Sequence, residues 1–281
     1  LKIKIFYINA NVHNNSIWLK FYMKPISKII FNNITLTCVP SKSISNNLEK
    51  IYSKEKILIT GDSRFDQIIQ RYTKNNKKSY LPKYFLDSYN IIFGSYDIHD
   101  EKIILNSLRS CFPEGDKSLI KQNRRIILVP HEIDNATVYR IVNQLKKYNF
   151  NPTLYTSIYE TKEKSNILIV NYIGILADIY KYCELAYVGA GFGHGVHSVI
   201  EPAIYGCKIS FGPNIELLDE AKYMYNNKLG YMICNILDMC KFINLDKADI
   251  NLNKKMGILK NYIFNNQKSS EKIMDLIKQH I

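Results

Sequence analysis

The sequence contains few glycines, no paired cysteine motif and no long apolar run, and each shortage narrows the class of protein. Glycine provides 12 of the 281 residues, and no repeat or long low-complexity tract is present. The six cysteines include no C-x-x-C pair and no spacing that suits zinc, which predicts reduced thiols in a cytosolic compartment. No apolar run reaches the ~20 residues that span a bilayer, so we expect the chain by itself to be soluble.

Acidic residues are also in the minority, with 25 Asp and Glu against 38 Lys and Arg and a net charge of +13. The lysines are spread along the chain, which favours a solvated basic surface over a dedicated groove for a polyanion. We therefore expect no specific nucleic-acid partner. Such a surface still favours an anionic membrane face or a phosphorylated substrate.

Strand-like and helical runs alternate along the whole chain, as is typical of parallel α/β sheets. We predict two Rossmann-like units, residues 1–80 with a polar linker at their end and residues 81–281. An apolar stripe with helical spacing, preceded by the N-cap candidate Asp134, predicts a helix over residues 135–148. Further helices are predicted over residues 16–30, 43–52, 100–110, 174–183, 216–228 and 256–280, and six strands are predicted in the second unit.

The first unit is short for its class. Its roughly 70 residues before the linker provide three predicted strands, whereas a doubly wound domain normally has about 100–150 residues. The chain also begins almost directly with a strand-like run at Leu1. We therefore expect the front half of this unit to be missing from the sequence.

Glycine is concentrated in one stretch, residues 187–206, which read YVGAGFGHGVHSVIEPAIYG. Four of the twelve glycines fall within seven residues, between a predicted strand and a predicted helix. A loop without Cβ atoms can approach an anion closely, and the N–H groups of the following helix then point at it. A tight turn without a ligand is the alternative. The nearby His194, His197 and Ser198 favour a phosphate cradle, although the spacing is not the dinucleotide fingerprint G-x-G-x-x-G.

The helix after the glycines carries a carboxylate near its start. Proline is tolerated only in a first turn, so the helix begins within a few residues before Pro202. Glu201 then lies in the first turn, where it can accept hydrogen bonds from ribose hydroxyls or simply offset the helix dipole.

Three other strand ends carry polar residues that we expect at the same edge of a sheet. They are residues 61–64 (GDSR), Gly94 with Ser95, and His131 with Glu132. Any one of these would be an ordinary loop, but several convergent polar strand ends indicate a binding site.

Together these segments resemble the 3-deoxy-D-manno-octulosonic acid (Kdo) transferases of lipopolysaccharide synthesis. The resemblance covers nearly the whole chain and rests on the order and approximate spacing of TGDSRFDQ, FGS, PHEI, NYIGILADIYKYCELAYVGAGFGHGVHSVIEPAIYG and SFGPN. It implies a GT-B fold, with two Rossmann-like domains, and an inverting transfer of Kdo from CMP-Kdo to a lipid A precursor. It implies no metal ion and no cofactor other than the donor substrate.

The resemblance also implies roles for individual residues. Gly191, Gly193, His194 and the helix start with His197 and Ser198 would face phosphate, and Glu201 would face the ribose. Ser95, His131 and Glu132 would line the same pocket and meet the base or the Kdo carboxylate. Arg64 in the first domain would be an anion partner. The protein would act at the cytoplasmic face of the bacterial inner membrane as a peripheral protein, and a separate N-terminal half is a further expected partner.

Two departures from the family pattern stand out. The chain has His197-Ser198 where the family usually has His-Asn, and serine can still cap or donate. The general base of the family is a glutamate that would lie upstream of residue 1, so no residue of this chain is assigned as the catalytic base.

Two other interpretations keep the residues but change the function. Another sugar-nucleotide enzyme of the same fold, a UDP-sugar transferase or an epimerase, would share the glycine and EPAIYG features. A catalytically dead remnant or interaction module would explain the expected loss of the base.

Overall fold

The computed structural model describes residues 3–74, 79–160, 164–245 and 251–280, and the chain divides into two compact units. Unit 1 comprises Leu1–Asn75 and Asn261–Ile281, and unit 2 comprises Asn76–Lys260. Of the predicted linker, residues 75–78 lie outside the described part, and the helix before them continues to Lys74. No helix in the described part of the chain has both the length and the apolar character of a membrane span.

Unit 1 contains a parallel three-stranded sheet in the order β1-β2-β3, as the alternating pattern predicted. A helix follows each strand. The strands are β1 (Phe6–Tyr7), β2 (Leu36–Val39) and β3 (Ile57–Ile59), and the helices are α1 (Lys24–Asn32), α2 (Lys42–Leu48) and α3 (Ser63–Lys74).

The predicted helix over residues 16–30 is interrupted. A short 3-10 turn, η1 (Ile17–Leu19), comes first, and α1 begins only at Lys24 with Pro25 in its first turn. The break lies next to Pro25 because proline fixes φ and has no N–H for the preceding turn.

The predicted C-terminal helix over residues 256–280 is two helices, α12 (Asn251–Asn265) and α13 (Ser269–His280). Lys268 lies between them in the left-handed region, with φ +69°. We expected this segment to pack with the second unit, but residues 261–281 belong to unit 1.

Long-range contacts hold α13 to unit 1. Asp66 in α3 accepts hydrogen bonds from the backbone N–H groups of Lys268 and Ser270, both at 2.6 Å. Ile273 packs with Leu36 and Cys38 of β2. These contacts join positions more than 200 residues apart, which periodicity along the sequence does not reveal.

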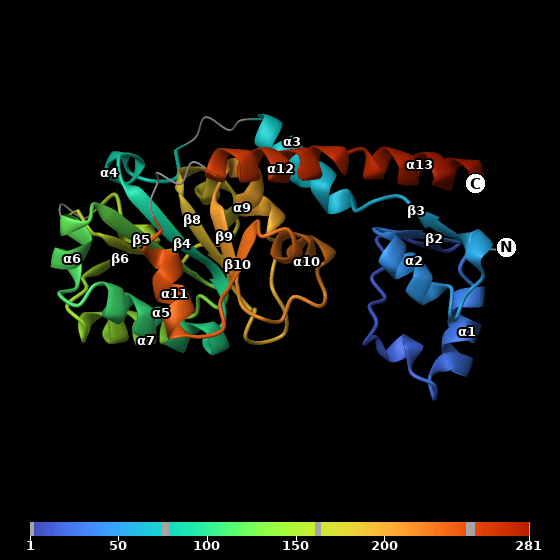
Figure 1. The fold of residues 1–281 in the computed structure, drawn as a ribbon, viewed down its shortest axis with the longest axis horizontal. Coiled ribbons are helices and arrows are strands. Elements are labelled where there is room, and N and C mark those ends of the chain that lie inside the picture. The colour runs from blue at the N-terminus through green and yellow to red at the C-terminus, as the bar shows by residue number, and fades with distance from the viewer. Residues whose placement is uncertain (1–2, 75–78, 161–163, 246–250, 281) are drawn as a thin grey trace. The chain divides into compact units, whose positions relative to one another are not determined.

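Unit 2 is built on a seven-stranded parallel sheet in the order β10-β9-β8-β4-β5-β7-β6 (Figure 1). All six strands predicted for this unit are present, and the seventh strand, β10, was not predicted. The strands are β4 (Tyr89–Tyr96), β5 (Arg124–Pro130), β6 (Pro152–Leu154), β7 (Ile167–Ile169), β8 (Leu185–Val188), β9 (Lys208–Phe211) and β10 (Gly230–Met232).

Helices cover both faces of this sheet, because successive residues of each buried strand point to opposite sides. Ile91 and Phe93 of β4 pack with α5 (Ile98–Cys111), α7 (Asn135–Lys146) and α11 (Ile236–Ile243). The intervening Ile92 packs with α4 (Lys83–Leu86) and α8 (Leu176–Ile179), on the face where α9 (Ile200–Tyr205) also lies. Unit 2 also contains α6 (Asp116–Lys121) and α10 (Asp219–Asn226). Helix α10 corresponds to the middle of the helix predicted over residues 216–228.

Helix α7 matches its prediction closely. The Asp134 side chain accepts hydrogen bonds from the N–H groups of Ala136 and Thr137, both at 3.0 Å, and therefore caps the helix. The predicted apolar stripe consists of Val138, Ile141, Val142 and Leu145, and all of these except Val142 are buried.

The strand order reverses at β4. From β4 the sheet extends through β5 in one direction and through β8 in the other. In open parallel sheets such a reversal leaves a crevice beyond the carboxyl ends of the two central strands, and ligands bind there.

Candidate functional site

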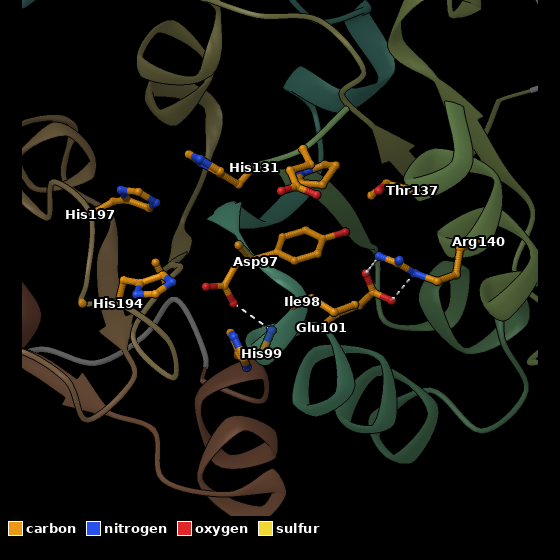
Figure 2. A pocket seen from close by; sticks show the side chains of 14 residues that line it. Asp97, Ile98, His99, Glu101, His131, Thr137, Arg140, His194 and His197 are labelled. Carbon is orange, nitrogen blue, oxygen red and sulfur yellow. Dashed lines mark hydrogen bonds and ion pairs between the residues drawn. The ribbon is translucent and has the colours of Figure 1, made fainter. Parts of the chain in front are cut away.

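A pocket of about 580 Å³ opens in unit 2 at the carboxyl ends of β4, β5 and β8, where the strand order reverses. Its walls come from the start of α5, from the loop and helix that follow β5, and from the loop that follows β8 (Figure 2). The polar side chains that line it are Tyr96, Asp97, His99, Glu101, His131, Glu132, Thr137, Arg140, His194 and His197.

Histidine is concentrated in this pocket, which holds four of the six histidines of the chain. The rings of His131 and His197 are stacked, with their centroids 5.2 Å apart and their planes 15° apart. The Ser95 hydroxyl lies 3.1 Å from Nδ1 of His131. Burial, and then the neighbouring His131, lowers the pKa of His197 below its ordinary value. An arriving anion would oppose this shift, so a neutral His197 can take up a proton as an anion binds.

An ion pair forms another wall of the pocket. Arg140 donates from Nε to Glu101 Oε1 at 3.1 Å and from Nη2 to Glu101 Oε2 at 2.8 Å. The Glu101 side chain is almost fully buried and the Arg140 side chain is 41% exposed. The pair therefore brings a well-oriented guanidinium to the pocket.

Asp100 connects two walls of the pocket, the start of α5 and the loop that follows β8. Its carboxylate is fully buried and accepts hydrogen bonds from Tyr187 Oη (2.7 Å), the Ala190 N–H (2.6 Å) and the Asp97 N–H (3.0 Å). The Asp97 side chain in turn accepts from the N–H groups of His99 and Asp100, so the two aspartates form a capping box at the start of α5.

Asp97 and Asp100 were not among the site residues predicted from the sequence. The i, i+3 spacing of two carboxylates before a helical run was the available signal, and it explains why α5 begins at Ile98 instead of at residue 100. Burial raises the pKa of the Asp100 carboxyl, and the three hydrogen bonds oppose that rise.

The backbone is strained where β4 and β8 end. Ser95 and Ala190 have left-handed φ values of +51° and +67°, and the pairing of β4 with β5 shifts by one residue between Gly94 and Tyr96. A left-handed φ is energetically unfavourable for a residue other than glycine, and such backbone strain is common at binding sites.

The glycines after β8 serve close packing between loops. A Cβ atom at Gly189 would collide with the backbone of Ser95 and Tyr96, and one at Gly191 would collide with the backbone of Gly212. A Cβ at Gly193 would meet the carboxylate of Asp97. Only Gly195, with φ +122°, is required by its own backbone conformation. These contacts account for the glycines without a ligand, and a phosphate cradle stays a prediction.

The glycines do not lead directly into a helix, contrary to the expectation. Turns and irregular backbone follow Gly189, and α9 begins only at Ile200. Pro202 is the third residue of α9, so its predicted place in a first turn is confirmed. Glu201 is also in this turn. Burial raises the pKa of the Tyr180 hydroxyl, and the nearby Glu201 carboxylate raises the pKa of Tyr180 further.

The structure brings together part of the predicted site. His131, Glu132, His194 and His197 line the pocket, and Ser95 contacts His131. The described residues that line the pocket do not include Gly191, Gly193, Ser198 or Glu201.

Arg64 belongs to unit 1, where its guanidinium forms two hydrogen bonds to the Asp62 carboxylate at 2.8 and 2.6 Å. Its role as an anion partner stays a prediction. Within the residues that the structure describes, no three His, Cys, Asp or Glu side chains are grouped as metal ligands.

The solved structure of Staphylococcus aureus MnaA with UDP has a similar fold. It matches this chain with a TM-score of 0.65 and 13% identity, over 99% of this chain and 70% of that one. Two parallel α/β units, the second with a pocket at its strand-order reversal, define the GT-B class.

In sequence the chain is similar to 3-deoxy-D-manno-octulosonic acid transferases. It is 24% identical to the Rickettsia typhi enzyme over an alignment of 289 positions, gaps included, which covers 98% of this chain and 58% of that protein. It is 25% identical to the Aquifex aeolicus enzyme over 230 residues, which cover 74% of this chain and 59% of that protein. The chain thus spans less than two thirds of the length of these relatives. No family model matches it.

Proposed function

We propose that the protein is a glycosyltransferase of the GT-B class that transfers Kdo from CMP-Kdo to a lipid A precursor, with inversion and without a metal ion. The observation that carries the proposal is the histidine-lined pocket at the strand-order reversal of unit 2. The similarity to Kdo transferases over nearly the whole chain supports the choice of donor. In this proposal unit 2 binds the donor and unit 1 belongs to the acceptor side.

The proposed arrangement of the donor follows from the resemblance to Kdo transferases, and of its residues His194 and His197 line the pocket. His194, His197 and the loop with Gly191 and Gly193 would face the phosphate. Ser198 would donate a hydrogen bond there, and Glu201 would accept from the ribose hydroxyls. A low-pKa imidazole such as His197 suits this position, because it can bind as a neutral donor and gain a charge as the anion arrives.

We expect the chain to bind CMP in preference to UMP in a calorimetric titration. Replacing Glu201 with alanine should weaken CMP binding by about tenfold or more, because hydrogen bonds from the ribose to a carboxylate would be lost. Glu114→Ala is the matched control, since Glu114 is an exposed glutamate of the same unit, away from the pocket.

The outcomes separate the alternatives. Preference for UMP would indicate a UDP-sugar transferase or an epimerase, a reading to which the UDP-containing structural neighbour also points. Absence of binding by a demonstrably folded chain would indicate a remnant or an interaction module. Equal affinities of the wild type and Glu201→Ala for CMP would contradict the ribose role of Glu201.

The proposal also includes a peripheral contact with an anionic inner membrane. The first 48 residues contain six lysines and no Asp or Glu. In the same region α1 and the turn before it expose large apolar side chains, with Phe21 at 84% and Ile29 at 67% exposure. Apolar side chains beside lysines are suited to the interface of an anionic bilayer.

We expect the chain to bind vesicles that contain anionic phospholipid and to bind pure phosphatidylcholine vesicles poorly. Changing Lys20, Lys24 and Lys28 to glutamine should weaken binding to the anionic vesicles by roughly one hundredfold in a co-sedimentation assay. The same triple change at the exposed lysines 83, 117 and 121 of unit 2 removes equal charge and serves as the control. Equal losses in both variants would show that net charge, not this surface, governs binding.

A further inference from the structure

Arg140 is the one Arg or Lys among the described residues that line the pocket. The carboxylates of Asp97, Glu101 and Glu132 line the same pocket. An anionic ligand would therefore meet more permanent negative charge than positive charge, apart from the histidines. Any anionic group bound away from the histidines depends on Arg140.

The guanidinium of Arg140 is held in place and still has donors to offer. Glu101 occupies Nε and Nη2, and Nη1 has no partner in the described part of the protein. Because Glu101 is nearly buried at the start of α5, it fixes the plane of the guanidinium. The Arg140–Glu101 pair and the pair His194 and His197 lie on opposite sides of the pocket (Figure 2).

A second, independent feature lies beside this arginine. Tyr96 lines the pocket and is 2% exposed, and its hydroxyl has no hydrogen-bond partner among the described residues. Burial, and then the nearby Glu101 carboxylate, raises the pKa of Tyr96 well above its usual value, so the hydroxyl keeps its proton. A buried hydroxyl without an acceptor is uncommon and calls for a ligand or a water molecule.

We infer that Arg140, with the Tyr96 hydroxyl beside it, binds the carboxylate of the transferred sugar. The inference rests on the proposed donor, which carries two anionic groups, a phosphodiester and a sugar carboxylate. The phosphate is assigned to the histidine side, so the carboxylate falls to the opposite side, where a planar guanidinium matches its two oxygens. Glu101 acts as a positioning residue that orients Arg140.

The test compares free Kdo acid with its methyl ester, which lacks the carboxylate charge, in ligand-observed NMR titrations with and without saturating CMP. We expect Arg140→Gln to weaken the binding of Kdo acid by at least about tenfold. The affinity for the methyl ester, which is already lower in the wild type, should not change. Arg140→Lys should retain only part of the wild-type affinity for Kdo acid, and Tyr96→Phe should weaken the binding of Kdo acid a few-fold. Arg109→Gln, an exposed arginine near the end of α5, is the control.

Equal affinity of Kdo acid for the wild type and Arg140→Gln would overturn the inference, as would an equal loss for acid and ester. Glu101→Gln tests the positioning role of Glu101. This variant should bind Kdo acid more weakly although Arg140 is still present. Failure of the wild type to bind CMP, with Kdo acid still dependent on Arg140, would overturn the proposed donor and leave the carboxylate site standing.

Discussion

Replacement of Asp100 with alanine is expected to destabilise unit 2 by about 3–5 kcal/mol. Three buried donors, the Tyr187 hydroxyl and the N–H groups of Ala190 and Asp97, would lose their shared acceptor. Each buried donor left unpaired costs about 1–3 kcal/mol. The loss should also loosen the pocket, because Asp100 links the start of α5 to the loop after β8.

The free energy of unfolding of unit 2 is best followed by urea-dependent hydrogen exchange of peptides from β4 and β8. The single tryptophan, Trp18, lies in unit 1 and does not report on unit 2. Tyr187→Phe removes one of the three donors and should cost about 1–2 kcal/mol. Tyr139→Phe, at an exposed position of α7, is the matched control and should be nearly neutral. A change below about 1 kcal/mol for Asp100→Ala would contradict this role.

Replacement of Gly189 with alanine is expected to cost about 3 kcal/mol and to abolish the ordered pocket. The added methyl group would collide with backbone atoms of Ser95 and Tyr96, which cannot turn away as a flexible side chain would. The Gly189 N–H also donates to the Gly94 carbonyl at 2.9 Å, so relief requires β4 and β8 to move apart where their ends line the site.

Gly257→Ala supplies the matched control for this change. Gly257 lies within α12, and a Cβ there would meet nothing within 4 Å. It should therefore stabilise the protein by about 0.5–1 kcal/mol, because alanine restricts the unfolded chain and favours a helix. Similar stabilities for the two variants in the same urea experiment would refute the collision at Gly189.

Much of the fold was predictable because its signals are local. Apolar periodicity and the cap at Asp134 placed α7, and the rigid φ of proline placed the start of α9 near Pro202. Alternating strands and helices predicted two parallel sheets. The strand β10 (Gly230–Met232) was not predicted from the sequence.

The candidate site was predictable only in part. His131 and Glu132 follow a buried strand, so their place at the sheet edge could be read from the sequence. Arg140 lies inside a helix whose pattern predicted only a packed face, and nothing local shows that it meets Glu101 of another helix. The glycines after β8 were noticed, but their immediate reason is contact with distant backbone.

By itself the sequence determined the alternation of strands and helices, the concentration of glycine and histidine after two strands, and the likeness to Kdo transferases. The tertiary structure decided which strands are neighbours, and therefore that Asp100 reaches Ala190 and that α13 packs on unit 1. The physical reason is that helix and strand periodicity depends on neighbours a few residues apart. Strand order and loop contacts depend on burying surfaces from segments that lie far apart along the chain.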